Sequence, residues 1–187
     1  MMAETCKQLI LSVAAGPCHD PLMTLGQRVT GVLLLEPATF EEIEADTSAT
    51  GQALTVVVAA SVAAGIGAGL LFGPLALVRE TLAALVGWVM WAGVIYLLGA
   101  RLMPEPDTKT DMGELLRVIG FSYAPSVFNI FAFIPLLGWV VRGIVACWLL
   151  AAMVIAVRQA LDYRSTARAA LVVFIGWLVF VIIVWVL

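Results

Sequence analysis

Long apolar runs, each separated from the next by a short polar segment, dominate the chain from Gly51 onwards. A helix needs roughly 20 consecutive apolar residues to cross the hydrocarbon core of a bilayer. We predict five spans: Gly51 to Phe72, Thr81 to Ala100, Glu114 to Gly138, Trp139 to Val157, and Ala167 to Leu187. The pattern therefore predicts an all-α fold, a five-span transmembrane helical bundle that occupies residues 51–187.

The third stretch, Glu114 to Gly138, is the one around which we expect the bundle to pack. It mixes prolines and polar side chains into an apolar run. A proline inside a span frees a backbone carbonyl, and lipid can satisfy neither that carbonyl nor the polar side chains. These groups should therefore face other helices. The residues assigned to this polar core of the bundle are Gly120, Ser122, Tyr123, Pro125, Asn129 and Pro135.

Three glycines recur at every fourth position near the end of the first span: Gly65, Gly69 and Gly73. Glycines at this spacing share one helix face and let another helix approach closely. We interpret them as helix-packing residues. The contact could lie within the chain or between two copies in a homo-oligomer, and we favour the contact within the chain.

Two short amphipathic segments, within residues 23–50, precede the spans. Leu25, Val29 and Val32 can form the apolar face of a first helix, with Gln27 and Arg28 opposite. After Pro37, the run Thr39-Phe-Glu-Glu42 predicts a capping box that opens a second helix. We expect both helices to be interfacial, lying on the membrane before the first span. Residues 1–22 are expected to be a leader or a disordered extension.

The second short helix carries an acidic run, and two interpretations of it stay open. Glu41, Glu42 and Glu44 form a solvated face in the simpler interpretation, and they dock a basic protein partner in the functional one. Farther along, Arg79-Glu80 is expected to be a charged turn, and Glu80 is expected to pair with Arg142 on the outer face.

Composition and charge place these elements in a membrane. Hydrophobic residues make up 63% of the chain and charged residues 12%, with a mean hydropathy of +1.06. A soluble domain is nearer half apolar and a quarter charged, so the chain is expected to be integral to a lipid bilayer. The net charge of −3 comes without a basic cluster, which argues against nucleic acid as a partner.

The positively charged residues are divided unevenly between the two sides of the predicted bundle. One side receives Lys7, Arg28, Arg101, Lys109, Arg117, Arg158, Arg164 and Arg168, and the other receives only Arg79 and Arg142. An excess of Lys and Arg marks the cytoplasmic face. We therefore expect the amino terminus inside and the carboxyl terminus outside, in a cytoplasmic membrane.

Candidate chemistry is sparse. The sole histidine, His19, lies in the amino-terminal extension, and with Cys6 and Cys18 it makes only a weak metal motif. Cys147 lies in an apolar run and is expected to be a small core residue. A nucleophilic Ser122 or Ser126 would lack a base, so we expect core hydroxyls, no catalytic residues, no metal site and no cofactor. Trp88 and Trp91 fall mid-span and are expected to pack.

Several short motifs point to a family. Gly120-Phe-Ser-Tyr-Ala-Pro125 is similar to a Gly-Tyr-x-x-x-Pro element, and the other matching segments are Pro37 to Gly51, Phe131 to Gly138, and Ala156 to Ala160. On these residues the chain, from about Met23 to Leu187, resembles the YIP family, five-span membrane proteins first described as interacting with Ypt/Rab GTPases. The Asp-Leu-Tyr-Gly-Pro element of eukaryotic members is absent, which favours the prokaryotic branch, for which the resemblance implies no catalytic residues.

Three classes of function are compared: an enzyme, a transporter or channel, and a scaffold. An enzyme lacks a catalytic constellation, and a transporter or channel usually places ionisable residues inside its spans, where this chain has only Arg142, about one turn into the fourth. We therefore expect a non-catalytic scaffold, trafficking-like protein or accessory subunit that binds protein partners through its helices and cytoplasmic face. A small-solute transporter is the alternative.

Overall fold

The computed structural model describes residues 23–106, 108–134 and 137–186, and for residues 67–72, 76, 80 and 184 it describes the backbone alone. Every regular element in this part of the chain is helical. In chain order these are α2 (Leu25–Leu33), α3 (Pro37–Ala45), α4 (Ala49–Phe72), α5 (Pro74–Ile95), the π-helix η1 (Tyr96–Leu102), α6 (Met112–Ser122), the 3₁₀-helix η2 (Ala124–Phe133), α7 (Leu137–Ala160) and α8 (Thr166–Val186).

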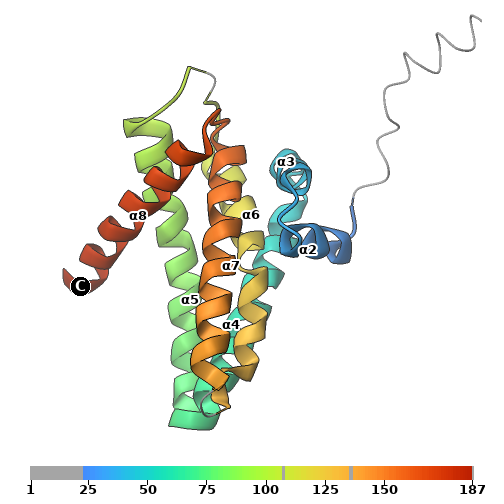
Figure 1. Cartoon of the computed structure of the whole chain (residues 1–187), viewed down its shortest axis with the longest axis vertical. Coiled ribbons are helices and arrows are strands. Elements are labelled where there is room, and N and C mark those ends of the chain that lie inside the picture. Colours follow the sequence, from blue (N-terminus) through green and yellow to red (C-terminus); the bar gives the residue numbers. More distant parts are fainter. Residues whose placement is uncertain (1–22, 107, 135–136, 187) are drawn as a thin grey trace, which may run out of the picture.

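Within the described residues, five segments are long and apolar enough to cross a membrane, so the expectation of an all-α five-span bundle is confirmed (Figure 1). They are Ala49–Ile66, Leu77–Leu102, Met112–Phe133, Leu137–Ala160 and Thr166–Ile183. Helices α4, α5 and α7 run alongside the combined α6 and η2, while α8 leaves the bundle at an angle (Figure 1).

The third span is the most enclosed of the five. Over an 18-residue stretch of this span 61% of the residues are buried, against 44% for the next, Ala49–Ile66. It is built from two helices that meet at Tyr123, because Pro125 has no N–H to continue an α-helical ladder. The 3₁₀-helix that follows rises about 2.0 Å per residue, more than an α-helix does. The short η2 therefore carries the chain to the far end of the bundle.

The turn between the first two spans lies elsewhere than the sequence suggested. Gly73 adopts φ +92°, in a region that favours glycine, and Pro74 begins α5 directly after it. The prediction of a charged turn at Arg79-Glu80 is wrong, since both residues lie within α5. A Gly-Pro pair breaks a helix through its backbone, whereas a charged pair one turn inside a span end can remain helical.

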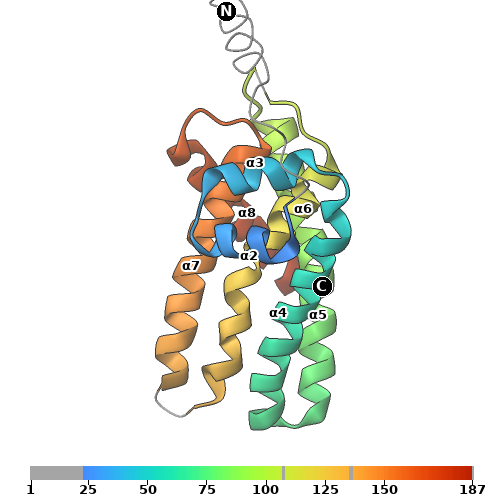
Figure 2. The same cartoon turned by 90° about the vertical axis from the view of Figure 1, so that its right-hand side faces the viewer.

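Helices α2 and α3 lie across one side of the upper half of the bundle (Figure 2). Helix α2 begins with a capping box between Thr24 and Gln27. It ends in a Schellman motif in which Leu35 has φ 59° and the Glu36 N–H bonds the Gly31 carbonyl at 2.9 Å. The predicted capping box at Thr39 and Glu42 is wrong, because Pro37 already opens α3.

The buried core joins this helix pair to the bundle. Phe40 and Ile43 of α3 are fully buried with Val57 of α4 and Val118 of α6. The two mid-span tryptophans are also buried, and their indole N–H groups donate hydrogen bonds inside the protein. Trp88 donates to the carbonyl of Leu116 at 3.1 Å, and Trp91 donates to the sulfur of Met153 at 3.3 Å. Cys147, by contrast, is exposed, so its assignment to the core is wrong.

The connections at the α2–α3 end are tied to one another. The hydroxyl of Tyr163 lies 2.9 Å from the carbonyl oxygens of both Gly99 and Met103. Arg168, at the start of α8, donates to the Met103 carbonyl at 3.1 Å and pairs with Glu105 at 3.3 Å. These contacts fix the first turn of α8 against the segment after η1.

Candidate functional site

The acidic residues of α3 that the sequence singled out lie at the junction of α2, α3, α4 and α6. We call the helix pair α2–α3, residues 25–45, the platform. Its contacts decide which of the three glutamates is free to meet a partner.

Arg28 is the centre of the platform. It was expected on the wet face of its helix, and this expectation is wrong, because Arg28 is fully buried. Its Nε donates to Oε2 of Glu42 at 2.9 Å, and its Nη2 donates to Oε1 of Glu42 at 2.7 Å. The guanidinium fork therefore grips one carboxylate with two parallel bonds, the geometry in which arginine binds carboxylates best.

Two further acceptors complete the shell around Arg28. Its Nη1 donates to Oε1 of Gln52 at 2.8 Å, and its Nη2 also contacts Oδ2 of Asp46. One side chain thus links α2, α3, the α3–α4 connection and α4. The hydrogen bond to Glu42 raises the pKa of Arg28 above its usual value. Hydrogen bonds from Ser48, and then from Arg28, hold the pKa of Asp46 below its usual value although burial opposes them.

Glu44 is in a different environment. Desolvation raises its pKa to about 7, and the neighbouring carboxylates of Asp162, Glu114 and Glu41 act in the same direction. Arg117 opposes the shift only weakly. Nη2 of this buried arginine donates to the backbone carbonyl of Glu44 at 2.6 Å, and so ties the end of α3 to α6.

Glu41 is the exposed member of the three. Its Oε1 accepts a hydrogen bond from Nε2 of Gln159 at 2.6 Å, across α3 and α7. The geometry therefore separates the three predicted docking residues. Glu42 is engaged with Arg28, Glu44 is partly buried beside α6, and Glu41 is exposed.

The predicted polar core of the third span lies mostly inside the bundle. Gly120, Ser122 and Pro125 are buried, and Tyr123 and Asn129 are half-buried. The hydroxyl of Ser122 donates to the Ile119 carbonyl at 2.7 Å, as a core hydroxyl does. Pro135 lies outside the described residues.

Gly120 makes the closest of these approaches. A Cβ at this position would lie 2.9 Å from the Cβ of Ala53 and 3.2 Å from Cζ2 of Trp88. The absence of a side chain lets α6 pack directly on α4 and α5.

The glycines of the first span have different environments. A Cβ on Gly65 would lie 3.1 Å from the carbonyl oxygen of Leu77, so α4 approaches the α5 backbone there. Gly69 lies in α4, where the structure describes the backbone alone, so its role in packing stays a prediction. Gly73 belongs to the turn before α5 instead of a packing face, since a Cβ there would meet no atom within 4 Å.

The outer ion pair stays a prediction. Arg142 is exposed on α7, and the side chain of Glu80 lies outside the description. Among the described residues, no group of three His, Cys, Asp or Glu side chains could hold a metal ion.

Sequence reasoning missed Arg28, Asp46 and Gln52 as a group. A signal was present in the spacing. Glu42 and Asp46 are four residues apart and so share one side of the chain near the end of α3, where an arginine from a neighbouring helix can meet both.

Residues 30–187 match the family model described as the Yip1 domain. The match covers the end of α2, α3 and all five spans. No curated protein and no solved structure matches the chain at a significant level.

Proposed function

The chain belongs to the Yip1 domain family of membrane proteins, and we propose that it is a non-catalytic scaffold that binds a protein partner through the exposed face of the platform. The observation that carries the proposal is the set of hydrogen bonds that buried Arg28 makes between the platform and the bundle. A buried arginine with three side-chain partners holds α2 and α3 against the bundle, so the platform has a fixed shape before any partner arrives. Binding then requires little ordering of the protein, which favours affinity.

The exposed face of the platform has a mixed chemistry. It presents the acidic Glu36 and Glu41, the polar Gln27 and Thr30, and one large apolar side chain, Leu34. Since Glu42 and Asp46 are already paired with Arg28, the exposed carboxylates of Glu36 and Glu41 carry the negative charge that a partner would meet. We infer a basic protein segment with an apolar anchor as the best-fitting partner.

The expected orientation of the bundle in the membrane supports the same proposal. The end of the bundle that carries the platform also holds Arg101, Arg158, Arg164 and Arg168, and an excess of such residues favours the cytoplasmic side. We propose a cytoplasmic membrane of a prokaryote, with the amino terminus inside and the platform facing the cytoplasm. At the far end, within the described residues, α5 begins directly after the turn at Gly73, so this connection offers little loop surface.

Partner recovery from gently solubilised membranes tests the proposal. The double variant Glu36→Lys, Glu41→Lys should reduce recovery of the co-purifying protein while expression and the melting temperature stay as in the wild type. Lys109→Glu reverses a charge that is also exposed but lies outside the platform, and it should leave recovery unchanged.

A second variant separates docking from folding. Glu42→Lys should lower the melting temperature, because it places a cation against buried Arg28. Equal recovery from the double variant and the wild type would contradict the docking surface. If the purified protein moves a solute across liposome membranes, and Asn129→Leu abolishes that flux while the fold stays intact, the protein is a transporter and the scaffold proposal is wrong.

A further inference from the structure

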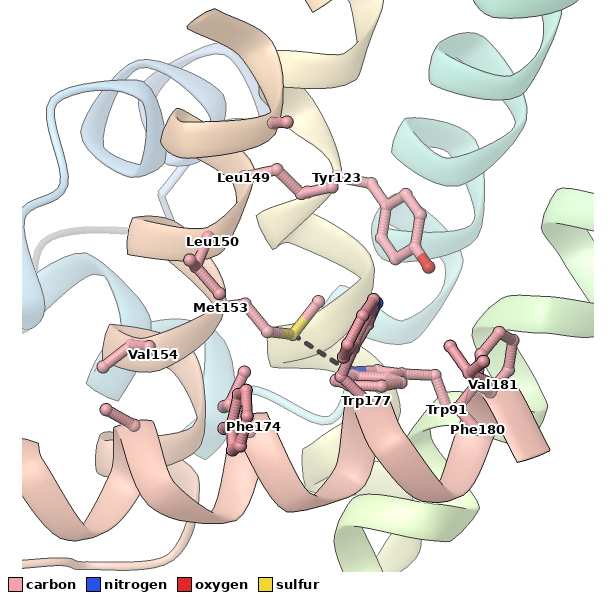
Figure 3. A pocket seen from close by; sticks show the side chains of 13 residues that line it. Trp91, Tyr123, Leu149, Leu150, Met153, Val154, Phe174, Trp177, Phe180 and Val181 are labelled. Atoms are coloured by element: carbon pink, nitrogen blue, oxygen red, sulfur yellow. Dashed lines mark hydrogen bonds between the residues drawn. The ribbon is translucent and has the colours of Figure 1, made fainter. Parts of the chain in front are cut away.

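A cavity of about 700 Å³ lies between α5, α7 and α8, and it is independent of the platform. Its walls include Trp91, Tyr123, Met153, Phe174, Trp177 and Phe180 (Figure 3). All of its other lining residues are Ala, Leu or Val. The volume is within the range of about 300–1,000 Å³ that small-molecule sites occupy.

The cavity exists because of the direction of α8. The first turn of this helix is held by Arg168 and Tyr163, and from there α8 leans away from the bundle (Figure 1). Trp91 and Phe180 still meet edge to face at 5.7 Å. The space between this contact and α7 is left unfilled. Protein interiors are close-packed, so an apolar space of this size that the chain itself does not fill is unusual and suits an occupant from outside the chain.

The chemistry of the walls excludes water. A buried water needs two to four polar partners, and the polar groups on these walls are few. The indole N–H of Trp91 already donates to the sulfur of Met153 at 3.3 Å, and that sulfur lies 3.6 Å from the hydroxyl of Ser122. What remains is aliphatic carbon, aromatic faces and the half-buried Tyr123.

The location of the cavity selects the occupant. It lies among residues of the spans Leu77–Leu102, Leu137–Ala160 and Thr166–Ile183, at the depth of lipid tails. The lining residues Leu150, Phe174 and Trp177 are also exposed on the outside of the molecule. The cavity is therefore open sideways, between α7 and α8, toward the hydrocarbon of the bilayer.

A helix from a second copy fits this space poorly. With side chains a helix is about 10–12 Å across and rises 1.5 Å per residue, so 700 Å³ holds only about four to six residues of it. A single hydrocarbon chain is far thinner and flexible enough to follow the walls. We propose that the cavity binds one acyl chain of a bilayer phospholipid, held between α5, α7 and α8.

Two tryptophans provide a matched pair of reporters. Trp91 and Trp88 lie one turn apart on α5 and are 8% and 6% exposed, so bulk lipid reaches both equally little. Trp91 lines the cavity and Trp88 does not. Two full-length variants are made, one that keeps only Trp91 and one that keeps only Trp88, with the remaining tryptophans changed to Phe. Each is reconstituted in bilayers of phospholipid that carries bromine on its acyl chains. Fluorescence should be strongly quenched for the variant that keeps Trp91 and little changed for the one that keeps Trp88.

A blocking variant tests whether quenching comes through the cavity. Ala146→Phe fills the space from α7 and should remove most of the quenching of Trp91. Cys147→Phe adds the same ring at the next position, which is exposed and outside the cavity, and should leave the quenching intact. If Ala146→Phe lowers the melting temperature, Ala170→Leu fills the same space from α8.

Three results would overturn the proposal. Equal, weak quenching of Trp91 and Trp88 would mean that no lipid chain enters. Strong quenching of Trp91 that persists in both folded blocking variants would mean that the lipid arrives by another route. Quenching that appears only when protein is diluted in lipid would mean that a second copy fills the space.

Discussion

The guanidinium of Arg28 and the carboxylate of Glu42 meet in a two-bond contact between α2 and α3, at 2.9 Å and 2.7 Å. Arg28 is completely buried, whereas the side chains of Glu42 and Asp46 keep 25% and 11% of their exposure. The cation is therefore the costlier group to leave without its partners. The contact makes the platform part of the folded bundle and places its stability under the control of one side chain.

Arg28→Ala should destabilise the protein by about 3 kcal/mol, the lower end of the range for breaking a buried ion pair. The lower end applies because Glu42 and Asp46 retain some contact with water. Arg28→Lys should recover only part of the loss, since an ammonium group cannot reproduce the fork. Denaturation in detergent measures both. The control is Arg101→Ala at an exposed arginine, and an equal loss there would contradict the role of Arg28.

Glu44 should make the stability depend on pH. Burial raises its folded-state pKa from 4.5 to about 7, so the folded protein holds this proton more tightly than the unfolded chain does. The resulting stability is fully present below about pH 4.5 and is lost as the pH rises to about 7. Above that value the dependence due to Glu44 should end.

Glu44→Gln isolates this effect. Gln stays neutral, so the variant should be more stable than the wild type at pH 8 and should lose the fall in melting temperature between pH 5 and pH 7. The neighbouring charges that also shape the profile are Glu41 on α3, Glu114 and Arg117 on α6, and Asp162 after α7. Glu41→Gln serves as the control, and an identical change of profile in both variants would assign the titration to the cluster as a whole.

Gly120→Ala should cost about 1–3 kcal/mol, the range for overpacking a filled core. The added Cβ would lie 2.9 Å from Ala53 and 3.2 Å from the Trp88 ring, so α4 or α5 would have to move. Gly143→Ala is the matched change on α7, where a Cβ meets nothing within 4 Å, and it should be neutral or slightly stabilising. Similar melting temperatures for the two variants would show that α6 can retreat without cost.

The five spans could be predicted because hydropathy over a long run depends little on tertiary detail. The enclosed third span could also be predicted, since lipid cannot satisfy its polar groups. Arg28 could not, because the helical pattern of α2 assigns it to the polar face and gives no sign that acidic residues of α3 cover that face. The same limit applies to the turn at Gly73 and to the direction of α8. Hydropathy marks both α4 and α8 as apolar, but the angle of α8 depends on contacts of Arg168 and Tyr163 with the distant segment after η1.

Labelling with a membrane-impermeant thiol reagent tests the orientation. The platform end of the bundle carries most of the described arginines, while Arg142 lies at the far end, so the platform end is expected inside the cell. With five spans, the end of α8 should then lie outside. In a chain whose Cys6, Cys18 and Cys147 are replaced, Val186→Cys should react in intact cells. Lys109→Cys, in the connection before α6, should react only after permeabilisation. The reverse pattern would place the platform outside the cell and remove the cytoplasmic partner, whereas labelling of both positions from one side would mean that α8 does not cross the membrane.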